Sequence, residues 1–326
     1  MFRKVTLTIA ISALAAFATA GTATAGPARH LVHPVIAYVT NAGSDTVTPI
    51  NTATNAALPA ITIGDQPEVI AITPNGKTAY VSASGVGTVT PINVATNTAR
   101  RAISVGARAY SVQIAITPNG KTAYVVDSEA DSVTPINVAT NTALPPIKVG
   151  LGPSDIVITP NGKTAYVSNG DSDTVTPINI ATNKALPPIT VGNSPYNLVI
   201  TPNGKTIYTA NYSSRSVTPI KVATNTALRS IPLTNRPVAL AVSPNGRTVY
   251  VCVYITGVVP INVATNTALR TIAVGDPTAI AITPNGKTAY VPHSLEGTVT
   301  PVNLATGKVL PAITTGYGPG AIVITH

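Results

Sequence analysis

A ten-residue stretch, ITPNGKTAYV, contains Gly-Lys-Thr, the residues with which phosphate-binding loops hold a phosphate. It occurs at 72–81, 116–125, 158–167 and 282–291, with close copies at 200–209 and 242–251. A phosphate loop requires G-x-x-x-x-G-K-[ST] between a strand and a helix. Here the following residues favour a second strand, and Asn-Gly is a strong signal for a hairpin turn. The repeated stretch therefore predicts a β-hairpin, not a phosphate site.

Two acidic segments carry oxygen-bearing side chains at alternate positions, as calcium-binding loops do. They are Asp127-Ser-Glu129-Ala-Asp131 and Asp171-Ser-Asp173. Neither segment supplies both the glycine and the distal glutamate of a complete EF-hand loop. Solvated acidic loops are therefore the main interpretation, and calcium is the alternative. No other cofactor and no metal are expected.

Other catalytic constellations have little support in the sequence. No G-x-S-x-G nucleophile motif occurs, and no nucleophile–base–orienter set can be assembled. The histidines do not share a strand at metal-ligand spacing, so we expect isolated surface residues at His30, His33, His293 and His326. The single cysteine, Cys252, excludes an intrachain disulfide and is expected to pack as a small buried apolar residue.

Seven tyrosines mark a repeat with spacings of 42, 44, 42, 42, 42 and 40 residues. They are Tyr38, Tyr80, Tyr124, Tyr166, Tyr208, Tyr250 and Tyr290. A unit such as 68–106 divides into four short segments rich in β-branched residues and bounded by Gly, Asn or Pro. This period and content predict an all-β fold, a seven-bladed β-propeller with four antiparallel strands per blade.

The two ends of the chain complement each other. It stops at AIVITH (321–326), an innermost-strand segment, and its repeats begin with PVIAYVT (34–40), a second-strand segment. We therefore expect the C-terminal strand to pair with the N-terminal blade and to close the ring, which removes an exposed edge. Residues 34–326 are predicted to be one propeller domain, expected to be a monomer.

The N-terminus has the pattern of a secretory signal peptide. A basic MFRK is followed by an apolar run and by Ala23-Thr24-Ala25, a typical cleavage site. Residues 1–25 are predicted to be the signal peptide and 26–33 a short lead, with a second possible cut before Gly21. The mature chain would be secreted, extracellular or in the cell envelope, without a transmembrane span. It would keep 18 basic and 11 acidic residues, a net charge of +7.

The segment Tyr38-Val39-Thr40-Asn41 spells the tetrapeptide that names the YVTN-type β-propeller repeat family, and the chain resembles that family over nearly all of 34–326. The resemblance implies the propeller fold. Similar proteins include surface-layer components, lactonase-like proteins and a periplasmic protein that binds single-stranded DNA. The fold alone therefore does not determine the function. One departure is a proline in each third strand, which implies a bulge or a locally unpaired strand. These prolines are Pro49, Pro91, Pro135, Pro177, Pro219, Pro260 and Pro301.

In a four-stranded meander, the first and third turns share one face, here called the bottom face. The second-to-third-strand loop and the link to the next blade share the other, the top face. Bottom turns keep a constant length, whereas every length change falls on top segments. All eleven mature acidic residues lie in top segments, and thirteen basic residues lie in or beside the bottom turns. The basic residues are Lys77, Lys121, Lys163, Lys205, Arg247, Lys287, Arg100, Arg101, Lys184, Lys221, Arg229, Arg270 and Lys308.

Variation in length and charge makes the acidic, tyrosine-bearing top face the candidate ligand site. Its candidate residues are Asp65, Glu68, Arg108, Tyr110, Asp127, Glu129, Asp131, Asp155, Asp171, Asp173, Tyr196, Asn197, Arg236, Asp276 and Tyr317. The innermost strands read as almost wholly apolar, which disfavours a charged catalytic channel below its mouth.

Three functions remain open. The main expectation is a secreted, non-catalytic propeller that binds a protein or small-molecule ligand through its top face. The alternative is a small-molecule enzyme, lactonase- or lyase-like, with its site at the top mouth of the channel. The third is binding of nucleic acid or an anionic cell-surface polymer by the basic bottom face. Nucleic acid is disfavoured because the basic residues and the non-repeat tyrosines lie on opposite faces, whereas a single-strand site needs both together.

Overall fold

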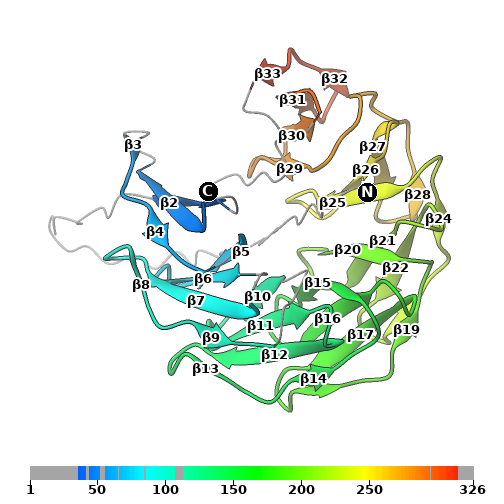
Figure 1. Ribbon diagram of the computed structural model, residues 1–326. Helices are drawn as coiled ribbons and strands as arrows, with labels where there is room; N and C mark the ends of the chain where they lie inside the picture. Colours follow the sequence, from blue (N-terminus) through cyan, green and yellow to red (C-terminus); the bar gives the residue numbers. More distant parts are fainter. Residues whose placement is uncertain are drawn as a thin grey trace, which may run out of the picture.

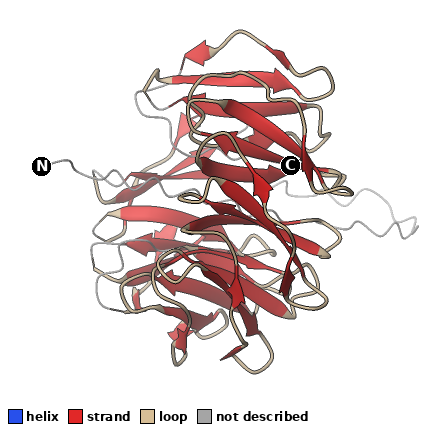
Figure 2. Cartoon of the chain, turned by 90° about the vertical axis from the view of Figure 1, so that its right-hand side faces the viewer, coloured by secondary structure: helices blue, strands red, loops and turns tan. Residues whose placement is uncertain are grey.

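The computed structural model describes residues 36–41, 44–51, 56–64, 66–83, 86–106, 113–293 and 295–314. These residues form seven antiparallel sheets around a common centre (Figure 1), and strands and loops are their only elements (Figure 2). The predicted all-β class and seven-bladed propeller are therefore confirmed. No helix in the described part of the chain could cross a membrane.

The innermost and second strands form the hairpins predicted from the repeated stretch. The innermost strands are β5 (Pro67–Ile72), β10 (Ile114–Ile116), β15 (Pro153–Ile158), β20 (Pro195–Ile200), β25 (Pro237–Val242) and β29 (Ala281–Ile282). The second strands are β1 (Ile36–Asn41), β6 (Thr78–Ala83), β11 (Thr122–Asp127), β16 (Thr164–Asn169), β21 (Thr206–Asn211), β26 (Thr248–Val253) and β30 (Thr288–His293).

The third strands carry the prolines, and the outer strands are short. The third strands are β2 (Thr46–Asn51), β7 (Thr88–Asn93), β12 (Ser132–Asn137), β17 (Thr174–Asn179), β22 (Ser216–Lys221), β27 (Gly257–Asn262) and β31 (Thr298–Asn303). The outer pieces are β3 (Ala56–Ala57), β4 (Ile61–Thr62), β8 (Thr98–Ala99), β9 (Ile103–Ser104), β13 (Thr142–Ala143), β14 (Ile147–Lys148), β18 (Lys184–Ala185), β19 (Ile189–Thr190), β23 (Thr226–Ala227), β24 (Ile231–Pro232), β28 (Thr267–Ala268), β32 (Lys308–Val309) and β33 (Ile313–Thr314). Blades 1 to 7 begin at β1, β5, β10, β15, β20, β25 and β29.

The third-strand prolines explain why the outer strand is broken into two pieces. In blade 4, the carbonyl of Pro177 accepts a hydrogen bond from Leu186 N at 2.8 Å. In an antiparallel strand, the backbone N and O of one residue face the same neighbouring strand. The Pro177 nitrogen, which has no hydrogen, therefore also faces the outer strand. Pairing with β17 stops there and resumes at β19. The expected local loss of pairing is confirmed, and these short outer pieces leave little edge for another chain to pair with.

The hydrophobic core lies between neighbouring blades. Tyr124 and Val133 of blade 3, for example, pack with Ile156 and Ile178 of blade 4, and all four are buried. Removing this apolar surface from water is the main stabilising contribution in such a fold. Each blade therefore depends on its neighbours, and the inner ends of the sheets are held at fixed positions around the centre.

A repeated hydrogen bond also joins consecutive blades. In blade 4, the Tyr166 hydroxyl donates to Asn225 Oδ1 of blade 5 at 2.6 Å, and Asn225 adopts a φ of 51° in its turn. The same bond joins Tyr38–Asn97, Tyr80–Asn141, Tyr124–Asn183 and Tyr208–Asn266. For Tyr250 the corresponding turn position is Gly307, which has no side-chain acceptor. The contact between blades 6 and 7 therefore lacks this bond.

Two expectations concern residues outside the described ranges. The predicted signal peptide and lead, 1–33, lie outside them, and so does the predicted ring-closing strand at 321–326. Cleavage and ring closure stay predictions.

Candidate active site at the mouth of the channel

The top ends of four innermost strands have an irregular register. The shifts lie between Pro67 and Ile70 in β5, and at the equivalent place in β15, β20 and β25. A bulge inserts a residue and re-aims the side chains beside it. Four polar candidates lie at these bulges, here called the mouth cluster: Glu68, Asp155, Tyr196 and Asn197. Figure 1 shows the strands that carry them around the centre of the ring.

Asp155 is a buried carboxyl group held between two blades, with 8% of its surface exposed. Its Oδ1 accepts a hydrogen bond from Ile156 N at 2.8 Å. Its Oδ2 accepts from Asn197 Nδ2 at 2.9 Å and from Leu198 N at 2.8 Å. Burial raises the pKa of Asp155 to about 7, and these three hydrogen bonds limit the rise. Both its acid and its carboxylate form are therefore present near neutral pH.

The amide of Asn197 has one orientation because it is bonded at both ends. Its Oδ1 accepts from Leu240 N of blade 6 at 3.0 Å, so its Nδ2 faces Asp155 of blade 4. An N–H donor cannot pair with the amide nitrogen, so a flipped amide would lose both bonds. Asn197 thus connects three blades and holds the Asp155 carboxyl group in place.

Tyr196 supplies a phenol that interacts electrostatically with two carboxyl groups. Burial raises its pKa to about 12, and the charges of Asp155 and Glu68 act in the same direction. Tyr196 is therefore a neutral O–H donor at physiological pH. Glu68 comes from blade 2 and Tyr196 from blade 5, so the cluster draws on widely separated blades.

Two serines support the bulge in blade 4. Ser168 Oγ accepts from Asp155 N at 3.1 Å, which satisfies a backbone donor that the bulge removes from the ladder. Ser154 Oγ lies 2.9 Å from Ser168 Oγ and donates to the carbonyls of Pro195 and Tyr196. These hydroxyls bond to each other and to backbone, so they position the cluster and are not activated nucleophiles.

One buried polar residue was missed by sequence reasoning. Gln113 is 7% exposed, and in blade 3 it occupies the position that Asp155 occupies in blade 4, the third residue after the link between blades. Comparing the copies at this position would have found it. From blade 2 to blade 7 the residues are Val69, Gln113, Asp155, Asn197, Ala239 and Ala279. The polar residues fall in consecutive blades.

Several predicted top-face acids cap backbone groups in the outer loops. Asp131 Oδ1 accepts from Gly152 N at 2.9 Å, and Asp173 Oδ1 accepts from Ser194 N at 2.8 Å. Asp276 Oδ1 accepts from Ile255 N at 3.1 Å. Each bond joins a second-to-third-strand loop to a link between blades. These bonds place loops and links on the same face, as expected.

In the two segments considered for calcium, carboxylate oxygens accept hydrogen bonds from backbone N–H groups. Asp127 is 1% exposed, and its Oδ1 accepts from Glu129 N and Ala130 N at 3.1 and 3.0 Å. Glu129 and Asp171 are exposed. Among the described residues, no three His, Cys, Asp or Glu side chains are grouped to hold a metal ion. Calcium binding stays a prediction.

Of the remaining candidates, only Arg236 lies within the described residues. Arg236 is exposed and stacks over the Tyr212 ring, with its guanidinium carbon 5.0 Å from the ring centroid. Asp65, Arg108, Tyr110 and Tyr317 lie outside the described residues.

Two predictions about single residues had different outcomes. Cys252 is fully buried and its Sγ lies 3.3 Å from Ala279 O, as expected for a packed thiol. The expectation that His293 is a surface residue is wrong, because it ends β30 and is 2% exposed. Its Nδ1 lies 3.2 Å from Asp276 O.

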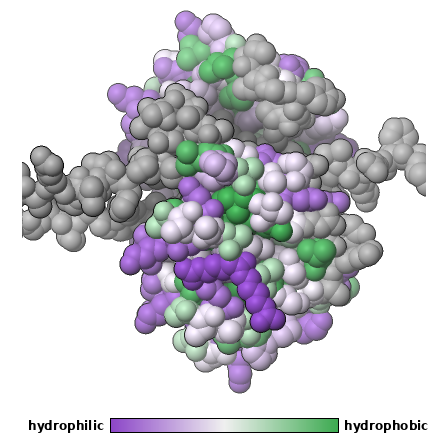
Figure 3. All heavy atoms as spheres, turned by 60° about the vertical axis from the view of Figure 1, so that its left-hand side comes forward, coloured by the Kyte–Doolittle hydropathy of each residue, from purple (hydrophilic) through white to green (hydrophobic). Residues whose placement is uncertain are grey.

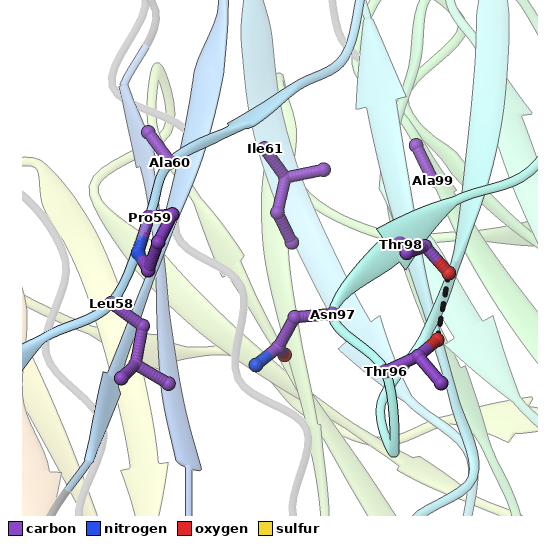
Figure 4. Close-up of a pocket in the computed structure, with 8 residues that line it drawn as sticks. All are labelled: Leu58, Pro59, Ala60, Ile61, Thr96, Asn97, Thr98 and Ala99. Carbon is purple, nitrogen blue, oxygen red and sulfur yellow. Dashed lines mark hydrogen bonds between the residues drawn. The ribbon is translucent and has the colours of Figure 1, made fainter.

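A separate groove of about 540 Å³ lies at the outside of blades 1 and 2. Leu58, Pro59 and Ile61 line one part, and Thr96 and Asn97 line another (Figure 4). No titratable side chain lines it, and Asn97 is occupied by the Tyr38 hydroxyl. On this side of the molecule, apolar patches are small and lie among hydrophilic side chains (Figure 3). The groove therefore lacks the groups for acid–base chemistry that the mouth cluster has.

Comparisons with known proteins agree with the fold. A family model described as lactonase, 7-bladed beta-propeller, matches residues 142–231, which include Asp155, Tyr196 and Asn197. No curated protein matches the sequence.

Many solved structures are similar to this chain, including the following three. Hydrazine synthase of Kuenenia stuttgartiensis has a TM-score of 0.64 at 20% identity, covering 89% of this chain and 99% of that one. A functionally unknown protein from Desulfotomaculum acetoxidans DSM 771 has a TM-score of 0.71 at 20% identity, with the same coverages. Dihydro-heme d1 dehydrogenase NirN, in complex with DHE, has a TM-score of 0.76 at 14% identity, covering 88% and 66%. Such identities show the fold alone.

The expectation of a non-catalytic binding propeller is contradicted by these findings. The matching family model is named for an enzyme. The expectation rested on the apolar character of the innermost strands. It overlooked that the few polar residues of these strands gather at one level, where bulges and neighbouring blades bring Asp155 and Asn197 together.

Proposed function

We propose that this chain is a small-molecule enzyme that hydrolyses a small lactone or related ester at the mouth cluster. The observation that carries the proposal is the Asp155 carboxyl group. It is buried, held by three hydrogen bonds, and has a pKa raised to about 7. A general base is most effective when its pKa is near the working pH. The assignment to the YVTN-type repeat, based on Tyr38–Asn41, is part of this proposal.

The proposed reaction uses groups that the cluster contains. The Asp155 carboxylate takes a proton from water while the water oxygen bonds to the lactone carbonyl carbon. The carbonyl oxygen gains the electron pair and is stabilised by a neutral O–H donor, the role assigned to Tyr196. The ring C–O bond then breaks, and the leaving alkoxide takes the proton from Asp155. The product is a hydroxy acid, and the base is regenerated.

The charge of the surrounding face favours a neutral substrate. Exposed Glu129 and Asp171 are on the top face with the other described acids. A cleft lined by one sign of charge attracts opposite charges and repels like ones. An uncharged lactone can enter this field, whereas a phosphorylated one is repelled. The hydroxy-acid product is an anion, so the same field favours its release.

The test is hydrolysis of a panel of neutral lactones by the wild type and by Asp155→Asn. The substitution keeps the shape of the side chain and removes the base. We expect kcat to fall by about 10²- to 10⁴-fold, the usual contribution of a general base. Thermal unfolding of both proteins at pH 6 would show that the variant is folded.

A matched control removes a top-face carboxylate outside the cluster. Asp173→Asn changes the same charge on the same face, and we expect it to leave kcat within about twofold. Hydrolysis that survives Asp155→Asn unchanged, or the absence of hydrolysis across the panel, would contradict the proposal.

A further inference from the structure

The bottom face of blades 2 to 7 carries a series of hairpin turns between the innermost and second strands. Each turn is closed internally: in blade 4, Asn161 Oδ1 accepts from Lys163 N at 2.9 Å and from the Thr159 hydroxyl at 2.7 Å. In blades 3 to 7, the glycine of each hairpin turn rests against the proline of the preceding blade's turn. A Cβ on Gly204 would lie 3.1 Å from Pro160 Cδ, for example. The turns are thus fixed relative to one another.

A second set of turns lies directly beside the first. In blade 4, Ile180 N of the third-to-outer-strand turn donates to Lys163 O of the hairpin turn at 3.0 Å. The same bond recurs at Lys77, Lys121, Lys205, Arg247 and Lys287. The two sets of turns therefore share one face. Four of the basic residues, Arg100, Arg101, Arg229 and Arg270, follow the first outer piece of their blades, just beyond the second set of turns.

All thirteen basic residues in or beside these turns are exposed. The ten described carboxylates belong to top-face segments, so none of them lies among these basic side chains. The turns use only the backbone N and O of their lysines, as Lys163 shows, which leaves the ammonium groups available to solvent. Like charges held on adjacent rigid turns repel one another. An anion laid along the ring would relieve that repulsion.

We propose that the bottom face binds a linear, phosphate-bearing polyanion that carries no aromatic bases. The cations are distributed around a ring and do not converge on one point, which suits an extended chain of charges better than a single phosphate. Lysine ammonium groups bind phosphate as point charges, and a polyanion gains free energy by releasing its condensed counterions.

The same residues disfavour two other partners. A single-stranded nucleic acid requires aromatic platforms beside the cations. The described tyrosines outside the repeat series, Tyr196, Tyr212 and Tyr254, are in top-face segments. The tips of the hairpin turns carry Pro, Asn, Gly and Lys or Arg, with no aromatic or long aliphatic side chain to enter a lipid bilayer.

The experiment measures binding of long-chain inorganic polyphosphate to the full mature chain over a range of salt concentrations. The test variant is Lys121→Gln/Lys163→Gln/Lys205→Gln, which neutralises three neighbouring turns and keeps their backbone bonds. The control, Lys148→Gln/Arg215→Gln/Arg236→Gln, removes the same charge away from the bottom turns. Melting temperatures verify folding, and polyphosphate should raise that of the wild type.

We expect the test variant to bind at least tenfold more weakly at low salt. The slope of log K against log salt concentration should be smaller in magnitude by about 2, because each of the three lost phosphate contacts contributes about 0.7. The control should stay within about twofold of the wild type. The proposal is overturned by no binding at low salt or by an equal loss in both variants. It is also overturned by tighter binding to phosphatidylglycerol vesicles or to single-stranded DNA than to polyphosphate.

Discussion

The innermost strands of blades 3 to 5 have a polar residue at one position where those of blades 6 and 7 have an apolar one. At the third residue after the link, the former have Gln113, Asp155 and Asn197, and the latter have Ala239 and Ala279. All five residues are buried. Blades 4, 5 and 6 share the backbone plan at this position, since β15, β20 and β25 have the same bulge. The difference is therefore chemical: one arc of the ring holds polar groups where the other holds alanine.

This contrast separates what the fold needs from what the site needs. Alanine at this position is fully buried in blades 6 and 7, so a polar residue is not required for packing. A buried polar residue is costly unless it is bonded, and Asp155 and Asn197 are both bonded. The polar arc thus carries a cost that the apolar arc avoids, which is expected of a functional site.

The largest expected effect on stability comes from Asp155. Its folded-state pKa of about 7 lies above its ordinary value of 3.8. The protonated Asp155 side chain therefore makes its full contribution to the free energy of unfolding below about pH 3.8. This contribution is lost as the pH rises through 7. We expect the free energy of unfolding of the wild type to fall by about 4 kcal/mol relative to Asp155→Asn across this window. Urea unfolding at pH 4 to 9 measures it; parallel curves for the two proteins would contradict the raised pKa.

A smaller effect is expected at Asn197. Asn197→Ala removes one donor to Asp155 and leaves Leu240 N without its acceptor. An unsatisfied buried donor costs about 1–3 kcal/mol. Loss of the Asn197 hydrogen bond should also raise the pKa of Asp155 further. Denaturant unfolding measures the first effect, and the pH profile of hydrolysis should move to higher pH. A destabilised variant with an unmoved profile would show that Asn197 has only a structural role.

The smallest effect concerns the tyrosine–asparagine bond between blades. Tyr166→Phe loses a bond to Asn225 of the next blade and should cost about 1 kcal/mol, whereas Tyr250→Phe loses only a bond to Thr248 within its own blade. Gly307→Asn should supply the missing acceptor, because Gly307 has a φ of 68° that asparagine tolerates. We expect it to stabilise the protein by up to about 1 kcal/mol, and only when Tyr250 is present. A double-mutant cycle measured by thermal unfolding tests this, and an equal gain in Tyr250→Phe would contradict it.

Local signals predicted the fold well. The spacing of the repeat tyrosines predicted the blades, and Asn-Gly predicted the turns that connect innermost and second strands. The assignment of both basic turn sets to one face is confirmed by the bond from Ile180 N to Lys163 O. The proline effect at Pro177 was predictable as a loss of pairing, although not as a split of the outer strand.

The site could be predicted only in part. Asp155, Tyr196 and Asn197 were recognised as top-face residues, but they stood among many acids that cap loops, such as Asp131 and Asp173. Asp155 differs from these acids because it lies at a bulge and bonds to Asn197, which is 42 residues away in the sequence. Neither is visible in a local pattern, because both depend on how neighbouring blades dock.

The most direct test of the central claim is the pH dependence of kcat/KM for a neutral lactone. If Asp155 is the base, log kcat/KM should rise with a slope of about one per pH unit and level off above pH 7, its pKa in the free enzyme. Asp155→Asn should abolish this limb of the profile. A wild-type rate that is flat from pH 5 to 9, or a limb that persists in Asp155→Asn, would contradict the account.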